Sequence, residues 1–317
     1  MHRYLLNRYL LRRSLLLLPF MVAVSLLVFA VMHLLPADPA EVALRSNAIT
    51  PTPEAIALTR HELGLDAPFW SRYLQWLWQV LQLDFGRSFI TRAPVLAVFA
   101  QALPATLELA GTAFVLIVLL SLPLGIGCAL RENRLFDKTV RCVLFITVAI
   151  PSYWLGLLLI WGLAVGLAGF DVVGGEGRSA VVLPAITLAA GYLGTYVRLI
   201  RGNMLAALNQ PFVWYARARG VPERVIILRH VLRNSLHSAL SAMAMSLPKL
   251  MAGTVVIEHI FARPGIGRLC VSAIFNRDYP VIHMYILFMA MLFLVSHFLV
   301  DIAHAWLDPR MTTGAAQ

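Results

Sequence analysis

The chain has 317 residues, of which 60% are hydrophobic and only 13% are charged, and its mean hydropathy is +0.77. Soluble domains carry roughly a quarter charged residues, so this composition excludes an ordinary water-soluble protein and indicates that lipid is the main solvent. The net charge of +10 comes almost entirely from arginine, which is compatible with binding to nucleic acid or to an anionic membrane surface. The positions of the arginines must decide between the two.

Six apolar windows are long enough to cross the hydrocarbon core of a bilayer, which takes about 20 residues. They lie at about 14–35, 105–130, 143–168, 181–199, 235–257 and 281–307. The first follows a basic stretch, as in a signal peptide, but its apolar run exceeds the roughly 7–15 residues of a signal peptide's hydrophobic region. We therefore expect a retained helix, and an all-α integral membrane protein with about six transmembrane helices.

Arginine and lysine near the ends of the spans predict the orientation, because cytoplasmic loops carry an excess of both. With the N-terminus inside, sixteen of these residues face the cytoplasm, nine face the other side, and Lys249 lies within a span. Five of the nine lie in the segment 36–103, which is long enough for its charge to count little. We expect both termini in the cytoplasm, and we interpret the basic charge as a sign of topology and not of nucleic-acid binding.

The segment 36–103 is the one sizeable region that we expect on the outer side. Pro53-Glu54 predicts the start of a helix and Gly64 predicts its end. The aromatic-rich stretch 69–83 is typical of a helix at the membrane interface, although a helical cap packed on the spans explains it equally well. The expected organisation is a cytoplasmic N-terminus with the first span at 1–35, an outer segment at 36–103, a membrane core at 104–307 with a cytoplasmic loop at 200–234, and a tail at 308–317.

Motifs of catalysis are missing from the sequence. There is no Gly-x-x-x-x-Gly-Lys-Ser/Thr phosphate loop, and His61-Glu62 lacks the second histidine of a zinc-protease motif. We therefore expect a transport subunit and not an enzyme, with no cofactor bound by this chain. Polar groups inside spans are costly in lipid and usually face a bundle interior or a pathway. The weak candidates for a pathway are Lys249, Glu258, His297, Asp301 and His304.

Three of these candidates fall on one face of the last span. His297, Asp301 and His304 are spaced i, i+4 and i+7. Such a face is compatible with contact to a metal ion or a chelate, and equally with a histidine–carboxylate network that holds helices together. The sequence assigns no metal site.

The loop 200–234 has a more specific pattern than the others. Pro211 opens a short helix of aromatic and basic residues, Gly220 forms a hinge after it, and Pro222-Glu223 opens a second basic helix that runs into the fifth span. A solvated basic loop would explain the arginines but not the aromatic face or the glycine and proline. A short exposed helix with aromatic and arginine side chains suits insertion into a partner's groove.

This loop resembles the EAA loop of ABC importer permeases, and most closely that of the dipeptide, oligopeptide and nickel family. The resemblance rests on Tyr215-Ala216-Arg217-Ala218-Arg219-Gly220-Val221 followed by Leu228-Arg229-His230-Val231-Leu232. Trp214 stands where the family has Glu, and Arg233 where it has Pro. Further matches at 63–66, 84–86, 103–108, 261–265, 277–280 and 307–310 cover nearly the whole chain, and 45–54 with 272–277 resembles the nickel transport permeases most.

The resemblance implies the fold of a type I ABC importer permease in the bacterial inner membrane. It also implies a second homologous permease subunit, two ATPase subunits that bind ATP and Mg, and a periplasmic solute-binding protein. The ATPase-coupling residues would be Phe212, Tyr215, Ala216, Arg217, Arg219, Gly220 and Val221. Closure of the ATPases would pull the helix before Gly220 and switch the spans between inward-open and outward-open states.

The expected substrate is nickel or a nickel–metallophore chelate, and the alternative within the family is a di- or oligopeptide. Two alternatives from other classes remain open. One is a secondary transporter or channel that needs no ATPase, although inverted repeats are not evident. The other is a membrane scaffold without transport activity.

Overall fold

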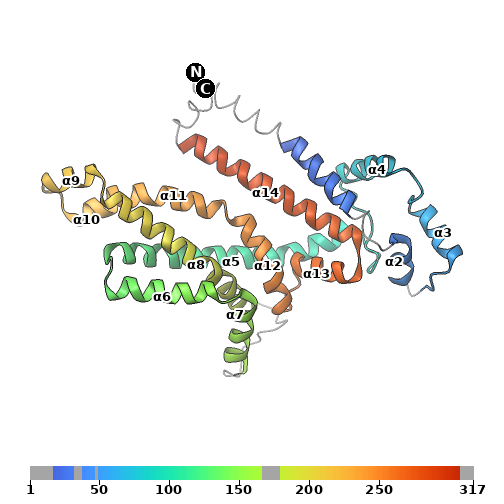
Figure 1. The fold of residues 1–317 in the computed structure, drawn as a ribbon, viewed down its shortest axis with the longest axis horizontal. Coiled ribbons are helices and arrows are strands. Elements are labelled where there is room, and N and C mark those ends of the chain that lie inside the picture. Colours follow the sequence, from blue (N-terminus) through green and yellow to red (C-terminus); the bar gives the residue numbers. More distant parts are fainter. Residues whose placement is uncertain (1–16, 32–37, 47–48, 166–178, 308–317) are drawn as a thin grey trace, which may run out of the picture. The chain divides into compact units, whose positions relative to one another are not determined.

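The computed structural model describes residues 17–31, 38–46, 49–165 and 179–307, apart from the side chains of 163–165, 179, 237–238 and 303–307. All regular elements within these ranges are helices, as Figure 1 shows. Arg87 and Pro94 form an isolated antiparallel bridge in the loop before α5. The predicted all-α fold is confirmed.

The helices follow one another with short connections. A first helix covers Leu17–Val31. It is followed by α2 (Pro39–Ser46), α3 (Pro53–Glu62), α4 (Phe69–Leu81), α5 (Val95–Leu130), α6 (Leu135–Ala149), α7 (Ser152–Leu159), α8 (Ser179–Leu208), α9 (Pro211–Ala218), α10 (Glu223–Val225), α11 (Leu232–Ala244), α12 (Leu247–Ile260), α13 (Ile266–Asn276) and α14 (Tyr279–Leu307). Two π-helical turns, η1 (Ile160–Val165) and η2 (Ile226–Val231), continue α7 and α10.

The described helices account for three to five membrane spans. Val95–Leu130, Ala180–Leu208 and Tyr279–Ile302 are each long and apolar enough to cross a bilayer, and two bent helix pairs raise the number to five. Both ends of the first predicted span lie outside the described residues, as do the N-terminus and the tail at 308–317. The count of six spans and the cytoplasmic termini therefore stay predictions.

Two of the predicted spans are broken, where we expected single helices. In the span predicted at 143–168, α6 and the helix that begins at Ser152 are bent by 101°. Pro151 explains the break, because it has no N–H for the helix and forces Ile150 into an extended conformation (φ −79°, ψ 125°). The span predicted at 235–257 is bent by 50° between α11 and α12.

The chain forms two compact units, Thr106–Arg263 and a second one made of Met1–Ala105 with Pro264–Gln317. Helix α5 contributes residues to both. These units are defined by contacts between residues, whereas the boundaries expected from the sequence mark where the chain enters and leaves the membrane. The two divisions therefore differ in kind, and the expected boundaries remain predictions.

The unit Thr106–Arg263 is organised around α8, against which α6, α7, α11 and α12 pack. Small residues allow α5 and α6 to approach α8 closely. A Cβ added to Gly125 would lie 2.7 Å from the Cβ of Ile200, and one added to Gly194 would lie 2.8 Å from Val148. The packed helices fix the base on which the loop after α8 stands.

In the other unit, the two helices predicted from local signals are confirmed. The hydroxyl of Thr52 accepts a hydrogen bond from Ala55 N–H (3.3 Å) at the start of α3, and Gly64 has φ +64° just after its end. Helices α2 and α13 were not predicted. At the start of α2, Asp38 Oδ1 accepts a hydrogen bond from the N–H of Ala40 (3.0 Å).

Helix α4 combines the two roles weighed for it. One face packs on the first helix, where the ring of Phe29 lies 5.6 Å from Tyr73 and 5.3 Å from Trp76. A second face exposes an apolar stripe formed by Trp70, Leu74, Trp78 and Leu81. Helix α4 is therefore packed as a cap and still presents a surface suited to a membrane interface.

Candidate coupling loop and polar sites

The loop after α8 has the predicted sequence of short helix, glycine and second helix. Pro211 takes the first position of α9, where its missing N–H does no harm. After α9, Gly220 has φ +73°, and its N–H donates to the carbonyl of Arg217 (2.9 Å) while that of Val221 donates to Ala216 (3.1 Å). These two bonds close the helix end, and only glycine adopts such a φ without strain.

Helix α9 presents two different faces. Val213 is fully buried, and Phe212, Ala216 and Val221 pack against the buried core of the unit. On the other face Trp214 and Tyr215 are 65% and 72% exposed. The predicted coupling residues are thus split into an inner group that anchors the helix and an outer group that can meet a partner.

The outer group contains Tyr215, Arg217, Arg219 and Gly220, all of them exposed. It also contains the exposed Trp214, which is not among the coupling residues predicted from the sequence. The helical periodicity of the sequence could have indicated Trp214, because it places Trp214 and Tyr215 on the face opposite the apolar residues on either side of them.

An ion pair spans the turn at Gly220. Arg217 donates to Glu223 at the start of α10 through Nη2 (2.6 Å to Oε1) and Nε (3.2 Å to Oε2). The hydrogen bond to Glu223 raises the pKa of Arg217 above its ordinary value. Exposed pairs of this kind contribute little to stability, so we assign the pair to orienting α9 relative to α10.

A buried ionic contact joins α6 to α8. Asp137 is fully buried and accepts two hydrogen bonds from Arg201, of 2.9 Å each, and one from the N–H of Asn133 (3.0 Å). Arg141 lies 3.3 Å away at the edge of the contact. Sequence reasoning missed this site, although an acid in the first turn of an apolar helix is a signal.

Lys249 and Glu258 do not form a common site. Both lie on α12, but Lys249 is exposed and Glu258 is fully buried. Glu258 accepts a short hydrogen bond from the hydroxyl of Thr106 in α5 (2.6 Å). The hydroxyl of Tyr192 donates to the backbone carbonyl of Lys249 (2.9 Å), so this contact does not involve the amino group of the lysine side chain.

The polar face of the last span is described only in part. His297 is half-buried, with Nδ1 2.7 Å from the carbonyl of Phe293 and its ring stacked on that residue's ring. Asp301 is half-buried one turn further on, and the side chain of His304 lies outside the described residues. Across the side chains that the structure describes, no group of three histidines, cysteines or acids is placed to hold a metal ion.

Comparison with known families gives matches along most of the chain. The family described as "Binding-protein-dependent transport system inner membrane component" matches residues 121–313, and the N-terminal family of the same transport components matches residues 6–110. Together the two matches cover the spans, the segment 36–103 and the loop after α8.

Relatives with the same extent carry different substrates in their names. A metal-staphylopine import system permease of Staphylococcus aureus is 38% identical over 310 residues, which is 97% of this chain and 99% of the relative. A putative peptide transport system permease of Brucella abortus is 37% identical over 303 residues (93% and 95%). A glutathione transport system permease of Salmonella choleraesuis is 34% identical over 303 residues (96% and 98%).

Proposed function

This chain belongs to the family of binding-protein-dependent transport system inner membrane components, as a permease subunit of an ABC importer, and we propose that it couples ATP hydrolysis in partner subunits to the import of nickel or a nickel–metallophore chelate. Family membership argues against the alternatives of a scaffold and of a transporter that works without an ATPase. The family also implies an ATPase and a solute-binding protein as partners.

The observation that carries the coupling proposal is the two-faced helix α9. Its inner residues are anchored in the core formed by α8, η2 and α11, so a displacement of α9 must displace these helices as well. Its outer residues are Trp214 and Tyr215 beside Arg217 and Arg219, a set that fits an apolar groove with an acidic rim. In this proposal, one copy of the loop inserts into one ATPase subunit.

ATP-driven closure of the ATPases would then act on the spans through α9. The spans would switch between a state open to the cytoplasm and a state open to the binding protein. A second, homologous permease would supply the other half of the pathway. ATP and Mg would bind to the ATPases and not to this chain.

The metal substrate is supported by the sequence resemblance of the segments 45–54 and 272–277 to nickel permeases and by the relative from a metal-staphylopine system. The peptide alternative is supported by the relatives from peptide and glutathione systems. The sequence identities of 38%, 37% and 34% are too similar to separate the metal substrate from the peptide substrate, so an uptake measurement is needed.

The test compares uptake of radioactive nickel and of a labelled dipeptide in cells with and without this gene. Nickel should be kept low in a medium of defined chelator content, so that other metal routes stay silent. We expect nickel uptake to fall in the deletion strain and dipeptide uptake to persist. Loss of dipeptide uptake alone would leave the assignment as an importer permease in place and would make a peptide its substrate. Normal uptake of both would overturn the assignment.

A further inference from the structure

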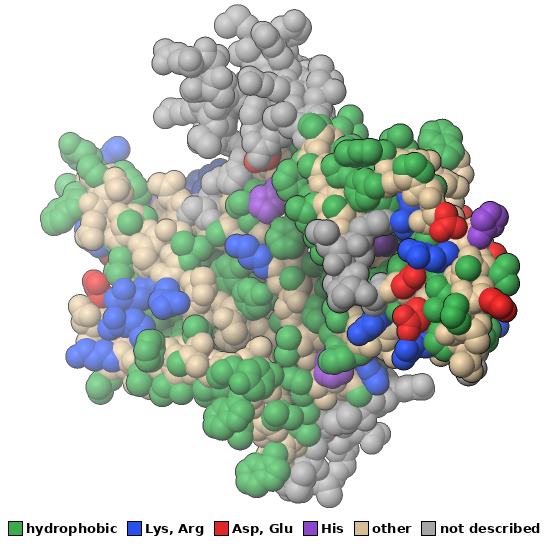
Figure 2. Space-filling model, turned by 45° about the vertical axis from the view of Figure 1, so that its right-hand side comes forward, with side chains coloured by type: hydrophobic (Ala, Val, Ile, Leu, Met, Phe, Trp, Pro, Cys, Tyr) green, Lys and Arg blue, Asp and Glu red, His purple; other side chains and the backbone are tan. Residues whose placement is uncertain are grey.

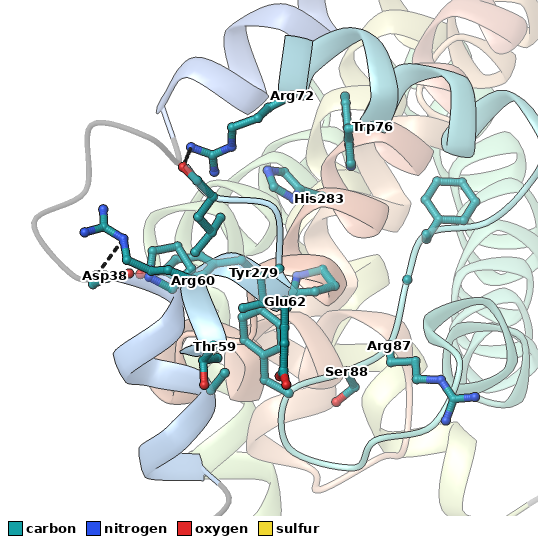
Figure 3. Close-up of a pocket in the computed structure, with 18 of the residues that line it drawn as sticks. Asp38, Thr59, Arg60, Glu62, Arg72, Trp76, Arg87, Ser88, Tyr279 and His283 are labelled. Carbon is teal, nitrogen blue, oxygen red and sulfur yellow. Dashed lines mark hydrogen bonds and ion pairs between the residues drawn. The ribbon is translucent and has the colours of Figure 1, made fainter. Parts of the chain in front are cut away.

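A cavity of about 870 Å³ lies within the unit formed by 1–105 and 264–317. Helices α2, α3 and α4, the loop 84–94 and the N-terminal part of α14 line it, and Figure 3 shows it in close-up. Its volume falls in the range of sites that bind small molecules, roughly 300–1,000 Å³. The loop after α8 and the pathway candidates Lys249, Glu258, His297 and Asp301 contribute nothing to it.

The wall of this cavity has an excess of positive charge. Four arginines line it, at positions 60, 72, 87 and 92, against two carboxylates, Asp38 and Glu62, which leaves two positive charges unbalanced. Figure 2 shows charged side chains of both signs gathered over the part of the molecule around α2 and α3. Arg60 lies 3.5 Å from Asp38, so this acid is already engaged at one edge.

Arg72 is the best-placed donor for a ligand. Its guanidinium, which carries five N–H donors, gives one hydrogen bond to the carbonyl of Leu65 (3.3 Å), its one acceptor among the residues that the structure describes. Partial burial and the positive charge of Arg60 lower the pKa of Arg72, and Asp38 and Asp66 offset this only in part. A bound anion would relieve the same repulsion.

Aromatic rings form another part of the wall. The ring of Trp76 lies 5.3 Å from those of both His283 and Phe29. In Figure 3 Trp76 and His283 lie close together on the side toward Arg72. Such rings provide a flat apolar surface for the carbon skeleton of a ligand, while the arginines meet its charges.

We propose that this cavity binds a small organic anion that carries two or more carboxylates. The forked guanidinium of Arg72 would pair with one carboxylate, and Arg60 would reach a second at the rim. Unlike the transport assignment, this binding requires no ATPase and no partner chain. It would hold for this chain whether the importer carries nickel or peptides.

The test is calorimetric titration of citrate into the full-length chain in nanodiscs of zwitterionic lipid, so that no anionic headgroup competes. We expect saturable binding that weakens as NaCl is raised, and no heat from glucose, a neutral solute of similar size. Absence of saturation up to about 10 mM citrate would overturn the proposal.

Variants locate the binding. Arg72→Gln should weaken citrate binding about tenfold, the size expected for the loss of a charged hydrogen bond. Arg60→Gln at the exposed rim should weaken it less, and it keeps the test valid if Arg72→Gln fails to fold. Arg45→Gln removes the same charge from an exposed arginine of α2 that does not line the cavity, and it should bind citrate as the wild type does. Equal affinity in all three variants would place the anion elsewhere and overturn the proposal.

Discussion

The carboxylate of Asp137 in α6 accepts two parallel hydrogen bonds from the guanidinium of Arg201 in α8, each 2.9 Å long. Asp137 is fully buried, and the side chain of Arg201 is 16% exposed. Charges buried in this way are costly unless their partners are kept, so the pair fixes the register of α6 on α8.

Loss of the buried partner should destabilise the permease. We expect Arg201→Gln to lower the stability of the chain by about 3 kcal/mol, because Asp137 keeps its charge without a bidentate partner. Thermal unfolding in detergent measures the effect. Arg141→Gln is the matched control, since this arginine contacts the same carboxylate at 3.3 Å but is 43% exposed. Equal melting temperatures for the two variants would show that the pair does not hold the helices.

The exposed aromatic pair of α9 should be needed for ATPase binding. We expect Trp214→Ala with Tyr215→Ala to reduce the ATPase that co-purifies with a tagged chain by about tenfold, as the loss of interface anchors of this kind predicts. Trp78→Ala in α4 is the control, because Trp78 is 64% exposed and Trp214 is 65% exposed. Retention of the ATPase by the double variant would exclude α9 as the docking element.

Gly220 should be needed for coupling and not for insertion. Proline fixes φ near −65° and has no N–H, whereas Gly220 has φ +73° and donates to Arg217. We expect Gly220→Pro to insert in the membrane normally, to leave ATP hydrolysis active and to lower uptake about tenfold or more. Gly64→Pro makes the same change after α3, where φ is +64° and the N–H donates to His61, and uptake should survive it. Wild-type uptake in Gly220→Pro would refute the coupling role.

Glu258 should act through its hydrogen bond with Thr106. Glu258→Gln keeps an acceptor oxygen for the hydroxyl and should give near-normal amounts of active permease. Glu258→Ala removes the acceptor from a site where both residues are fully buried, and it should cost about 1–3 kcal/mol of stability. If Glu258→Gln abolishes uptake while protein amounts stay normal, the carboxylate serves the pathway and not the packing.

Local signals in the sequence predicted the loop after α8 well. Pro211, Gly220 and Pro222 each act on their own backbone, so the short helix, the turn and the second helix follow from neighbours in sequence. The same holds for α3, which begins at a proline and ends before Gly64. The bend at Pro151 was equally local, and an apolar window that averages over 20 residues concealed it.

Pairs that are distant in sequence could not be predicted. Thr106 and Glu258 are 152 positions apart, and Asp137 and Arg201 are 64 apart. Which polar group in one span meets which in another depends on how the helices pack, and the pattern of hydrophobicity does not specify that. For the same reason the sequence marked both Lys249 and Glu258 as weak pathway candidates, whereas the structure places Lys249 at the surface and Glu258 in the core.

The ion pair across Gly220 indicates that this glycine forms a rigid turn and not a flexible hinge. Three kinds of contact hold the turn in one conformation. They are the two backbone hydrogen bonds, the contact of Arg217 with Glu223, and the burial of Val213 and Ile226 in one core. A glycine in such a frame is a fixed corner and not a flexible joint. Helices α9 and α10 would then move as one rigid body, so that a push on the exposed aromatic face of α9 would rotate η2 and α11.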